Sequence, residues 1–392
     1  KTMKWKFYSL AFVAGMSILT ACSSDDNNDN DGNGGNGNGN EIENGTILKG
    51  TITSDVTLAA GNTYKLSGEY IVEEGGTLHI EEGVKIIAVY DDIADYILVK
   101  QGGKINAVGT PDKPIVMTSE KEEPGAWGGI HICGRAHTNA EGGKGSSEIG
   151  GAVYGGNDDA DNSGTLQYIR LEYTGFAFDE EHEANGISFY SVGNGTIVDH
   201  CQAYKGSDDG FEFFGGSVNV SNLVAVSCSD DSFDWTEGWN GKGTNLVAYQ
   251  EAESTLGYDC DCLMECDNNG SNNAAIPFAH PVLKNLILVG NGGSKQGIRL
   301  RAGTEVEIDN AKVCGKGQPL TVETALTENA LKNGTSKLTN ITLTSELSSK
   351  EGIYTHADFI AVTSNKVDAN LSYSSFEDIR KECSWMNGSW VK

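Results

Sequence analysis

The chain has 392 residues, of which 51 are glycine and only 6 are proline, and its formal net charge is −27. This length suffices for one large domain or two ordinary ones. A chain this acidic repels phosphate groups and anionic lipids, so we expect no nucleic-acid partner. The charge instead favours divalent cations or cationic partners.

Residues 1–21 predict a signal peptide. Lys4 and Lys6 precede an apolar run, Phe7–Leu19, that is short for a membrane span. The run ends in Leu19-Thr-Ala-Cys22, which resembles the lipobox of bacterial lipoproteins. The resemblance implies cleavage before Cys22 and a lipid on its thiol, so that the protein is tethered to a membrane.

Residues 22–44 contain the lipidated Cys22 and a segment of mainly Asn, Gly and Asp. Such a composition buries too little apolar surface to offset its chain entropy, so we expect a flexible linker. The Ser23-Ser-Asp-Asp26 stretch resembles the surface-export signal of Bacteroidetes lipoproteins, which implies a position on the outer, cell-surface face of the outer membrane.

An internal repeat of 22 or 23 residues is the strongest signal for the fold. Ser207–Phe214 (SDDGFEFF) recurs as Ser229–Thr236 (SDDSFDWT), and Asn222–Val226 recurs as Asn245–Tyr249. This period predicts one coil of a parallel β-helix, in which equivalent residues of successive coils stack at about 4.8 Å. We therefore expect an all-β, right-handed parallel β-helix over residues 45–392, in preference to a β-sandwich.

Side chains alternate between the two faces of a strand, so stacked coils produce ladders of like residues. Three apolar ladders are expected to form core, and they are Phe189/Phe211/Phe233/Leu256, Phe213/Trp235/Tyr258 and Cys201/Leu223/Leu246. Cys201 is therefore expected to be a buried free thiol. A short helix at Val322–Leu331 is expected to interrupt or cap the last coils, in a carboxyl-terminal capping segment.

Three cysteines lie close together, at Cys260, Cys262 and Cys266. They could form a thiolate metal site, but no second CxxC or nearby His pair supports zinc. In an oxidising compartment we expect one or two loop disulfides instead.

Several segments resemble a family of Bacteroidetes surface lipoproteins that have a pectin-lyase-like β-helix body and no settled activity. They are Gly75–Gly83, Gly109–Val116, Trp127–Ile130, Asp208–Gly216 and Asp230–Trp235. The resemblance extends from about residue 45 to the carboxyl end. It implies the fold and the surface location, and it implies no reaction.

A looser resemblance is to pectin-degrading β-helix enzymes. Asp208-Asp209 and Asp230-Asp231 resemble the paired aspartates of polygalacturonases, but the Asn-Thr-Asp, Gly-His-Gly and Arg-Ile-Lys motifs of those enzymes are absent. Pectate lyases need calcium and a basic residue on the same face, for which Arg170, Lys205, Arg299 and Arg301 are available.

If the phenylalanines point inward, two ladders of carboxylates point outward. They are Asp208/Asp230/Glu253 and Glu212/Asp234. Two carboxylates about 5 Å apart repel by about 0.8 kcal/mol in water and about 3 kcal/mol at an effective dielectric of 20. A bound calcium ion, a protonated acid or nearby lysines and amides could relieve the repulsion, and we favour calcium at these five residues.

Asp209 and Asp231 fall on the inward side and are expected to accept hydrogen bonds from turn amides. Phe214 and Trp239 are candidate platforms for sugar rings, with Glu237 beside them as a polar contact. For Trp127 we prefer a role in the core or in a turn.

The sequence thus predicts a surface lipoprotein that binds extracellular glycan, assisted by calcium, near residues 200–260. One alternative is a polysaccharide lyase or glycoside hydrolase of the pectin-degrading type that uses the same carboxylates. Another is a non-catalytic adhesin or an accessory subunit of an outer-membrane transporter.

Overall fold

The computed structural model describes residues 40–91, 93–178 and 182–392. The predicted signal peptide, Cys22 and the linker as far as residue 39 lie outside the described residues. No helix within the described ranges is long and apolar enough to cross a membrane. The strand β1 (Asn40–Ile42) begins inside the segment predicted as linker, because it pairs in parallel with β3 (Val56–Leu58) and Ile42 packs against the core.

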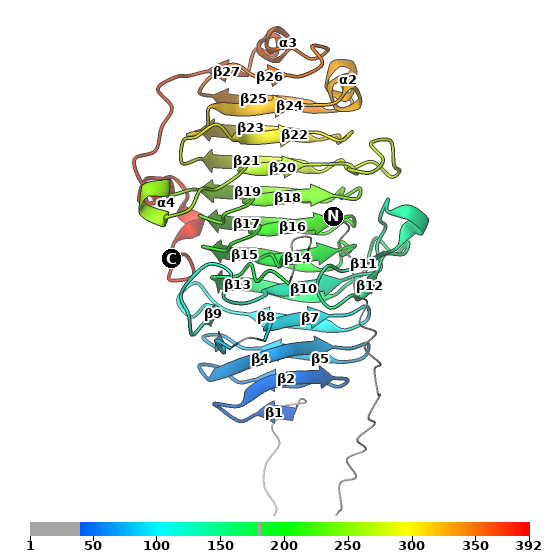
Figure 1. Cartoon of the computed structure of the whole chain (residues 1–392), viewed down its shortest axis with the longest axis vertical. Coiled ribbons are helices and arrows are strands. Elements are labelled where there is room, and N and C mark those ends of the chain that lie inside the picture. The colour runs from blue at the N-terminus through cyan, green and yellow to red at the C-terminus, as the bar shows by residue number, and fades with distance from the viewer. Residues whose placement is uncertain (1–39, 92, 179–181) are drawn as a thin grey trace, which may run out of the picture. The chain divides into compact units, whose positions relative to one another are not determined.

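The strands of the described domain form a parallel β-helix, as predicted (Figure 1). Each coil contributes short strands that pair in parallel with the equivalent strands of the coils before and after it. The first coils contain β1, β3, β2 (Ile47–Ile52), β4 (Thr63–Val72), β5 (Thr77–Ile80), β6 (Lys85–Ala88), β8 (Lys104–Val108) and β9 (Ile115–Ser119).

One face of the β-helix, here called the acidic sheet, continues from β4 through nine further strands. They are β7 (Tyr96–Val99), β10 (Ile130–Cys133), β14 (Ile187–Tyr190), β16 (Phe211–Phe214), β18 (Phe233–Thr236), β20 (Met264–Cys266), β22 (Gln296–Leu300), β24 (Gln318–Val322) and β26 (Ser348–Ser349).

A second series of strands runs beside the acidic sheet, and all of them except the two-residue β27 bend across a corner between two faces. They are β13 (Gly164–Glu172), β15 (Ile197–Tyr204), β17 (Asn219–Val226), β19 (Lys242–Tyr249), β21 (Val282–Val289), β23 (Glu307–Cys314), β25 (Lys337–Leu343) and β27 (Lys366–Val367). At the corner of five of them an asparagine has positive φ, as Asn222 does at 56°, which asparagine tolerates better than most residues.

Few helices interrupt the coils in the described residues. They are α1 (Glu253–Leu256), α2 (Ala325–Asn333), α3 (His356–Ala361), α4 (Phe376–Glu382) and the single turns η1 (Glu141–Gly143) and η2 (Ser384–Met386). The helix expected at Val322–Leu331 is found as α2, three residues later, because Val322 ends strand β24. A small antiparallel hairpin, β11 (Gly145–Ser146) with β12 (Val153–Tyr154), projects beside β10.

The interior is filled by the stacked apolar ladders that the repeat predicts. Phe211 pairs with Phe233, and Phe213 with Trp235, at 0–2% exposure. The third ladder, Cys201/Leu223/Leu246, is confirmed as well, and Cys201 is a buried free thiol. These parallel aromatic stacks remove large apolar areas from water, at roughly 25 cal/mol per Å².

Two of the predicted register steps are wrong. Phe189 stacks on Phe213 and not on Phe211, since the step between these coils is 24 residues. Leu256 and Tyr258 do not continue the core ladders, because residues after β19 form a loop with α1 and lengthen the next step to 31 residues. Cys266 therefore lies under Trp235.

Trp239 and Trp127 are both core residues. Trp239 is 1% exposed and stacks on Phe213 with ring centroids 4.1 Å apart, while its indole N–H donates to the Val218 carbonyl. Trp127 is also 1% exposed, and its indole N–H donates to the Glu172 carbonyl. The predicted role of Trp127 in the core is therefore confirmed.

The carboxyl-terminal segment returns along the outside of β17, β19 and β21. Ile379 of α4, Met386 and Trp390 pack against the outward valines of those strands. The Arg170 guanidinium donates to the Ser389 carbonyl at 2.7 Å, which fixes the end of the segment to β13. In Figure 1 this segment is the red chain that runs back from the last coil.

We expect Phe213→Ala to lower the free energy of unfolding by about 3–5 kcal/mol, because it empties a buried site between Phe189 and Trp239. Denaturant unfolding of the purified domain measures the change. Phe178→Ala is the matched control, since Phe178 is 43% exposed and should cost at most about 1 kcal/mol. Equal effects of the two substitutions would contradict the assignment of the core.

Candidate acidic cation site and adjoining cleft

The outward positions of the acidic sheet form one continuous polar ladder. Ser188 pairs with Glu212, Glu212 with Asp234, Asp234 with Glu265, and Glu265 with Arg299. Neighbouring strands lie about 4.8 Å apart, so these side chains stack directly above one another. The prediction that Glu212 lies over Asp234 is confirmed.

A second ladder lies at the turn before each strand. Asp209 Oδ1 accepts from the Asp231 amide at 2.8 Å, and Asp231 Oδ1 accepts from the Cys262 amide at 2.7 Å. One coil earlier, Asn185 Oδ1 accepts from the Asp209 amide at 3.2 Å. The expected role of Asp209 and Asp231 as acceptors for turn amides is therefore confirmed.

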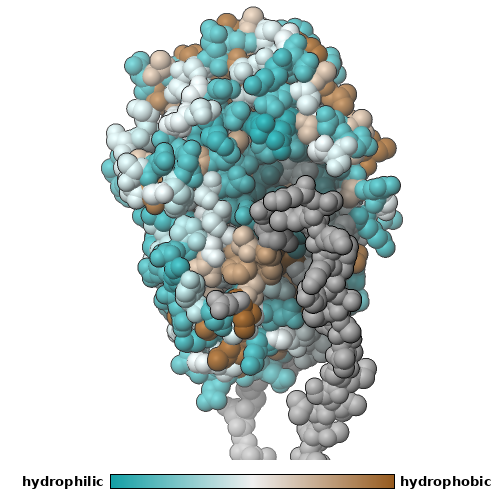
Figure 2. Space-filling model, in the orientation of Figure 1, coloured by the Kyte–Doolittle hydropathy of each residue, from teal (hydrophilic) through white to brown (hydrophobic). Residues whose placement is uncertain are grey.

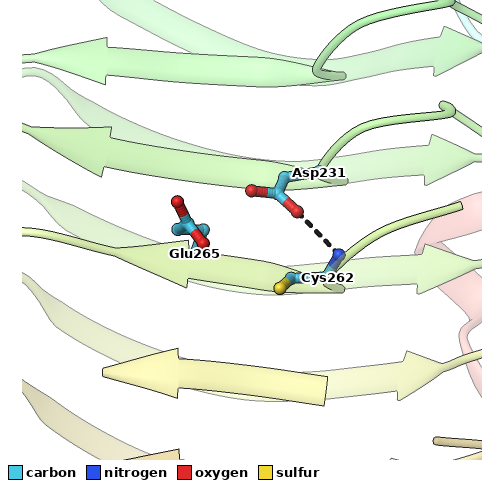
Figure 3. Close-up of side chains that lie close together, drawn as sticks. All are labelled: Asp231, Cys262 and Glu265. Atoms are coloured by element: carbon cyan, nitrogen blue, oxygen red, sulfur yellow. Dashed lines mark hydrogen bonds between the residues drawn. The ribbon is translucent and has the colours of Figure 1, made fainter. Parts of the chain in front are cut away.

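Residues of the two ladders, together with Asp208, Asp230 and Cys262, bring their ligand atoms together in three groups. Within each group the atoms lie within 4.8 Å of one another, and the groups are Asp208/Asp209/Asp230, Asp209/Glu212/Asp234 and Asp231/Cys262/Glu265. Figure 3 shows the third group, in which Asp231 lies above Cys262 and Glu265 lies beside them. Four of the five predicted metal ligands thus belong to this site.

Glu253, the fifth predicted ligand, does not belong to it. It is an exposed residue of α1, because the loop after β19 shifts the register, and Glu265 occupies the position under Asp234. Asp209, Asp231 and Glu265 were missed as site residues. The paired Asp-Asp of each repeat was a signal for the first two, whereas Glu265 has no counterpart at a 22-residue or 23-residue step.

The carboxylates of the site are buried beside one another, which opposes their ionisation. Burial, followed by repulsion from Asp230, raises the pKa of Asp208 to about 8. Burial also raises the pKa values of Asp209, Glu212, Asp231 and Asp234 well above their ordinary values. Stacked anionic groups of this kind are stabilised either by protons or by a cation.

The positive side chains of the acidic sheet lie at one end of the ladder. Arg299 pairs with Glu265 and Glu323, Arg301 pairs with Glu265 and Asp267, and Lys295 pairs with Asp261. None of the lysines or arginines in the described ranges forms an ion pair with Asp208, Asp209, Glu212 or Asp234.

The carboxylates of the ladder outside these ion pairs differ in how far hydrogen bonds satisfy them. Asp234 Oδ1 is shielded from solvent and has no hydrogen-bond partner within the described part of the chain. Glu212 Oε2 accepts one short bond, 2.6 Å, from the Asn185 amide group. Buried carboxylate oxygens without a donor cost free energy that a bound cation would recover.

The three groups differ in the ions that their atoms suit. Oxygen-only sets of carboxylates are the ligands that calcium prefers. The third group contains the Cys262 thiol, whose pKa burial raises, so the sulfur is a protonated thiol without a metal. The disulfides expected at Cys260, Cys262 and Cys266 are absent, since all three are buried free thiols on separate positions of the loop and β20.

A cleft of about 680 Å³ adjoins the ladder at the end of β18. It is lined by residues of three segments, which are Asn139, Ala140, Glu141, Thr236, Glu237, Asn269, Gly270, Ser271 and Asn272. In Figure 2 the visible surface over the upper coils is mostly hydrophilic. The lining contains no aromatic side chain, in contrast to the aromatic platforms expected from the sequence.

Glu237, predicted as a glycan contact, does lie in this cleft. Its Oε2 accepts from the Thr138 hydroxyl at 2.7 Å and from the Tyr154 hydroxyl at 2.9 Å. Burial raises its pKa, although these two donors lower it. The backbone places it there through a turn with positive φ at Glu237 and at Gly238, where a Cβ would meet the Pro277 carbonyl at 2.6 Å.

Phe214 and Trp239 are not available as sugar platforms. Phe214 is 7% exposed and stacks on Tyr190 with centroids 4.4 Å apart, because the hairpin β11–β12 covers this part of the sheet. Trp239 turns into the core after Gly238.

Comparison with known proteins agrees with the observed fold. Comparison with curated protein sequences gives no match. The crystal structure of the Dettilon tailspike protein aligns with 76% of this chain at 8% identity and a TM-score of 0.29, and this chain spans 56% of the tailspike's length. That similarity is too low to support an argument.

Residues 50–391 match the family described as the pectate-lyase-like β-helix domain. The match covers almost the whole described β-helix, from β2 to the carboxyl-terminal segment. The chain belongs to the pectate-lyase-like β-helix domain family.

Proposed function

We propose that this protein is a cell-surface lipoprotein, tethered through Cys22, that binds extracellular glycan along the acidic sheet with the assistance of calcium. The tether and the location rest on the lipobox-like sequence and the acidic residues after it. The proposal that the ligand is a glycan rests on membership of a β-helix family and on the polar cleft beside Glu237.

The observation that carries the calcium proposal is the shared position of Asp209. Its carboxylate belongs both to the group with Asp208 and Asp230 and to the group with Glu212 and Asp234. A calcium ion between these oxygens would offset their mutual repulsion and give Asp234 Oδ1 a partner. The residues present fit such an ion by the chemistry of their donors.

A pectin-degrading lyase or hydrolase is the second candidate. The raised pKa values of Glu212 and Asp234 favour it, because a carboxyl group that stays protonated can act as a general acid. Against a lyase, Arg299 and Arg301 are both held in ion pairs with glutamate and aspartate. We therefore favour binding over catalysis.

We expect Asp234→Asn to weaken calcium binding at least about tenfold, because it removes an anionic ligand. Isothermal titration of calcium into the chelator-treated protein measures the affinity. Asp112→Asn, on an exposed turn, is the control for the loss of one negative charge. Equal affinities for the wild type and the Asp234 variant would overturn the proposed site.

Without calcium, stability should fall as pH rises. Asp208, with a pKa of about 8, and Glu148, with a pKa raised chiefly by burial to about 7, bind protons more tightly in the folded state than in the unfolded state. Their protonation therefore stabilises the fold below about pH 4, and this contribution is lost between about pH 4 and 8.

The melting temperature, measured across this pH range in the presence of a chelator, tests whether stability falls as pH rises. We expect a decline towards pH 8 that added calcium reverses. A melting temperature that rises with pH in the chelated protein would contradict the assigned electrostatics.

Binding and turnover are separated by incubating the protein with immobilised and soluble glycans, with and without chelator. We expect calcium-dependent retention on a glycan and no shortened chains by mass spectrometry. Release of unsaturated or reducing-end fragments, lost in Asp234→Asn, would support the enzyme instead.

A further inference from the structure

The cleft beside Glu237 has a charge pattern that bears on which sugars it accepts. Its nine lining residues include two glutamates, Glu141 and Glu237, and no lysine, arginine or histidine. His137, whose Nε2 contacts the Gly238 carbonyl, has its other ring nitrogen paired with Asp159 at 2.6 Å. Arg299 and Arg301 of the acidic sheet are held in ion pairs with carboxylates. Lys144, which follows the η1 turn, is not among the lining residues.

The walls of the cleft are held in place before any ligand arrives. Asn139 is 7% exposed, donates to Asn268 Oδ1 at 2.8 Å and to the Pro277 carbonyl at 3.0 Å, and accepts from Asn269 Nδ2 at 3.0 Å. Asn269 Oδ1 in turn accepts from the amides of Ser271 and Asn272. A rigid wall of this kind lowers the entropy cost of binding.

A ligand that fills this cleft displaces water from two carboxylates. The hydroxyl groups of a neutral sugar can donate hydrogen bonds to these carboxylates, and a uronate is repelled by them. An ammonium group, in contrast, also neutralises their charge through charge-assisted hydrogen bonds. A volume of about 680 Å³ is in the range of small-molecule sites and accommodates a few sugar rings.

We propose that this cleft selects glycans that carry free amino groups, such as glucosamine oligomers, over uronic-acid chains and over their N-acetylated counterparts. The inference rests on the proposed glycan-binding function and names the substrate class of the same site. An amino sugar would bind through Glu141 and Glu237. A uronate bridged by calcium would instead bind at the carboxylate ladder.

Titration calorimetry on the calcium-loaded protein with matched tetrasaccharides tests it. The probes are tetra-glucosamine, its fully N-acetylated form and tetra-galacturonate. We expect tetra-glucosamine to bind at least about tenfold more tightly than the other two, and its affinity to fall with added salt. Equal or tighter binding of either other sugar overturns the amine preference but leaves glycan binding intact.

Two variants locate the preference in the cleft. Glu237→Gln should weaken tetra-glucosamine about tenfold and leave the N-acetylated form unchanged. Glu141 is exposed, so Glu141→Gln keeps the fold and should give a smaller loss in the same direction. Glu346→Gln, an exposed control on a distant coil, should have no effect.

The outcomes distinguish the two proposals. If no tetrasaccharide binds, both the amine preference and the proposed function fail. If tetra-glucosamine binds but Glu237→Gln, Glu141→Gln and Glu346→Gln reduce it equally, the binding is non-specific attraction to an acidic protein and the cleft is not the site.

Discussion

The structure depends on one constraint, which is the parallel, in-register stacking of successive coils. Every residue of β16 lies over its equivalent in β18, so each choice of side chain is repeated one strand spacing away. For the inward positions this repetition is favourable, because Phe211 stacks on Phe233 and Phe189 on Phe213. For the outward positions it is unfavourable, because it places Glu212 against Asp234.

The same constraint links the core to the candidate site. The aromatic stacks fix the strand register, and the register fixes the separation of the carboxylates. The turn aspartates contribute to both roles, since Asp209 binds the next coil's amide through one oxygen and belongs to two acidic groups. A cation at this position would therefore stabilise the stack while it organised a surface for a ligand.

Much of this arrangement was predictable from the repeat. The 22-residue step between Phe211 and Phe233 and the 23-residue step between Leu223 and Leu246 both hold, and with them the acidic ladder and the amide-capping aspartates. The sequence could not predict how a loop changes the step. The residues around α1 lengthen it to 31, which removes Glu253 from the ladder and substitutes Glu265.

Turn geometry limited the rest of the prediction. The sequence predicts Trp239 as an aromatic residue in a loop beside acidic residues. The positive φ at Gly238 instead directs the chain so that the indole enters the core. The cleft beside Glu237 is formed by segments that are more than 100 residues apart in the sequence, as the hydrogen bond between Asn139 and Asn268 shows. No local sequence pattern predicts such a contact.

The most direct test of the account is anomalous diffraction from crystals grown with calcium and then exchanged with terbium. The account predicts an anomalous peak within ligand distance of the Asp209, Glu212 and Asp234 carboxylates, whose ligand atoms already lie within 4.8 Å of one another. Crystals that diffract well and show only water among these carboxylates would contradict it.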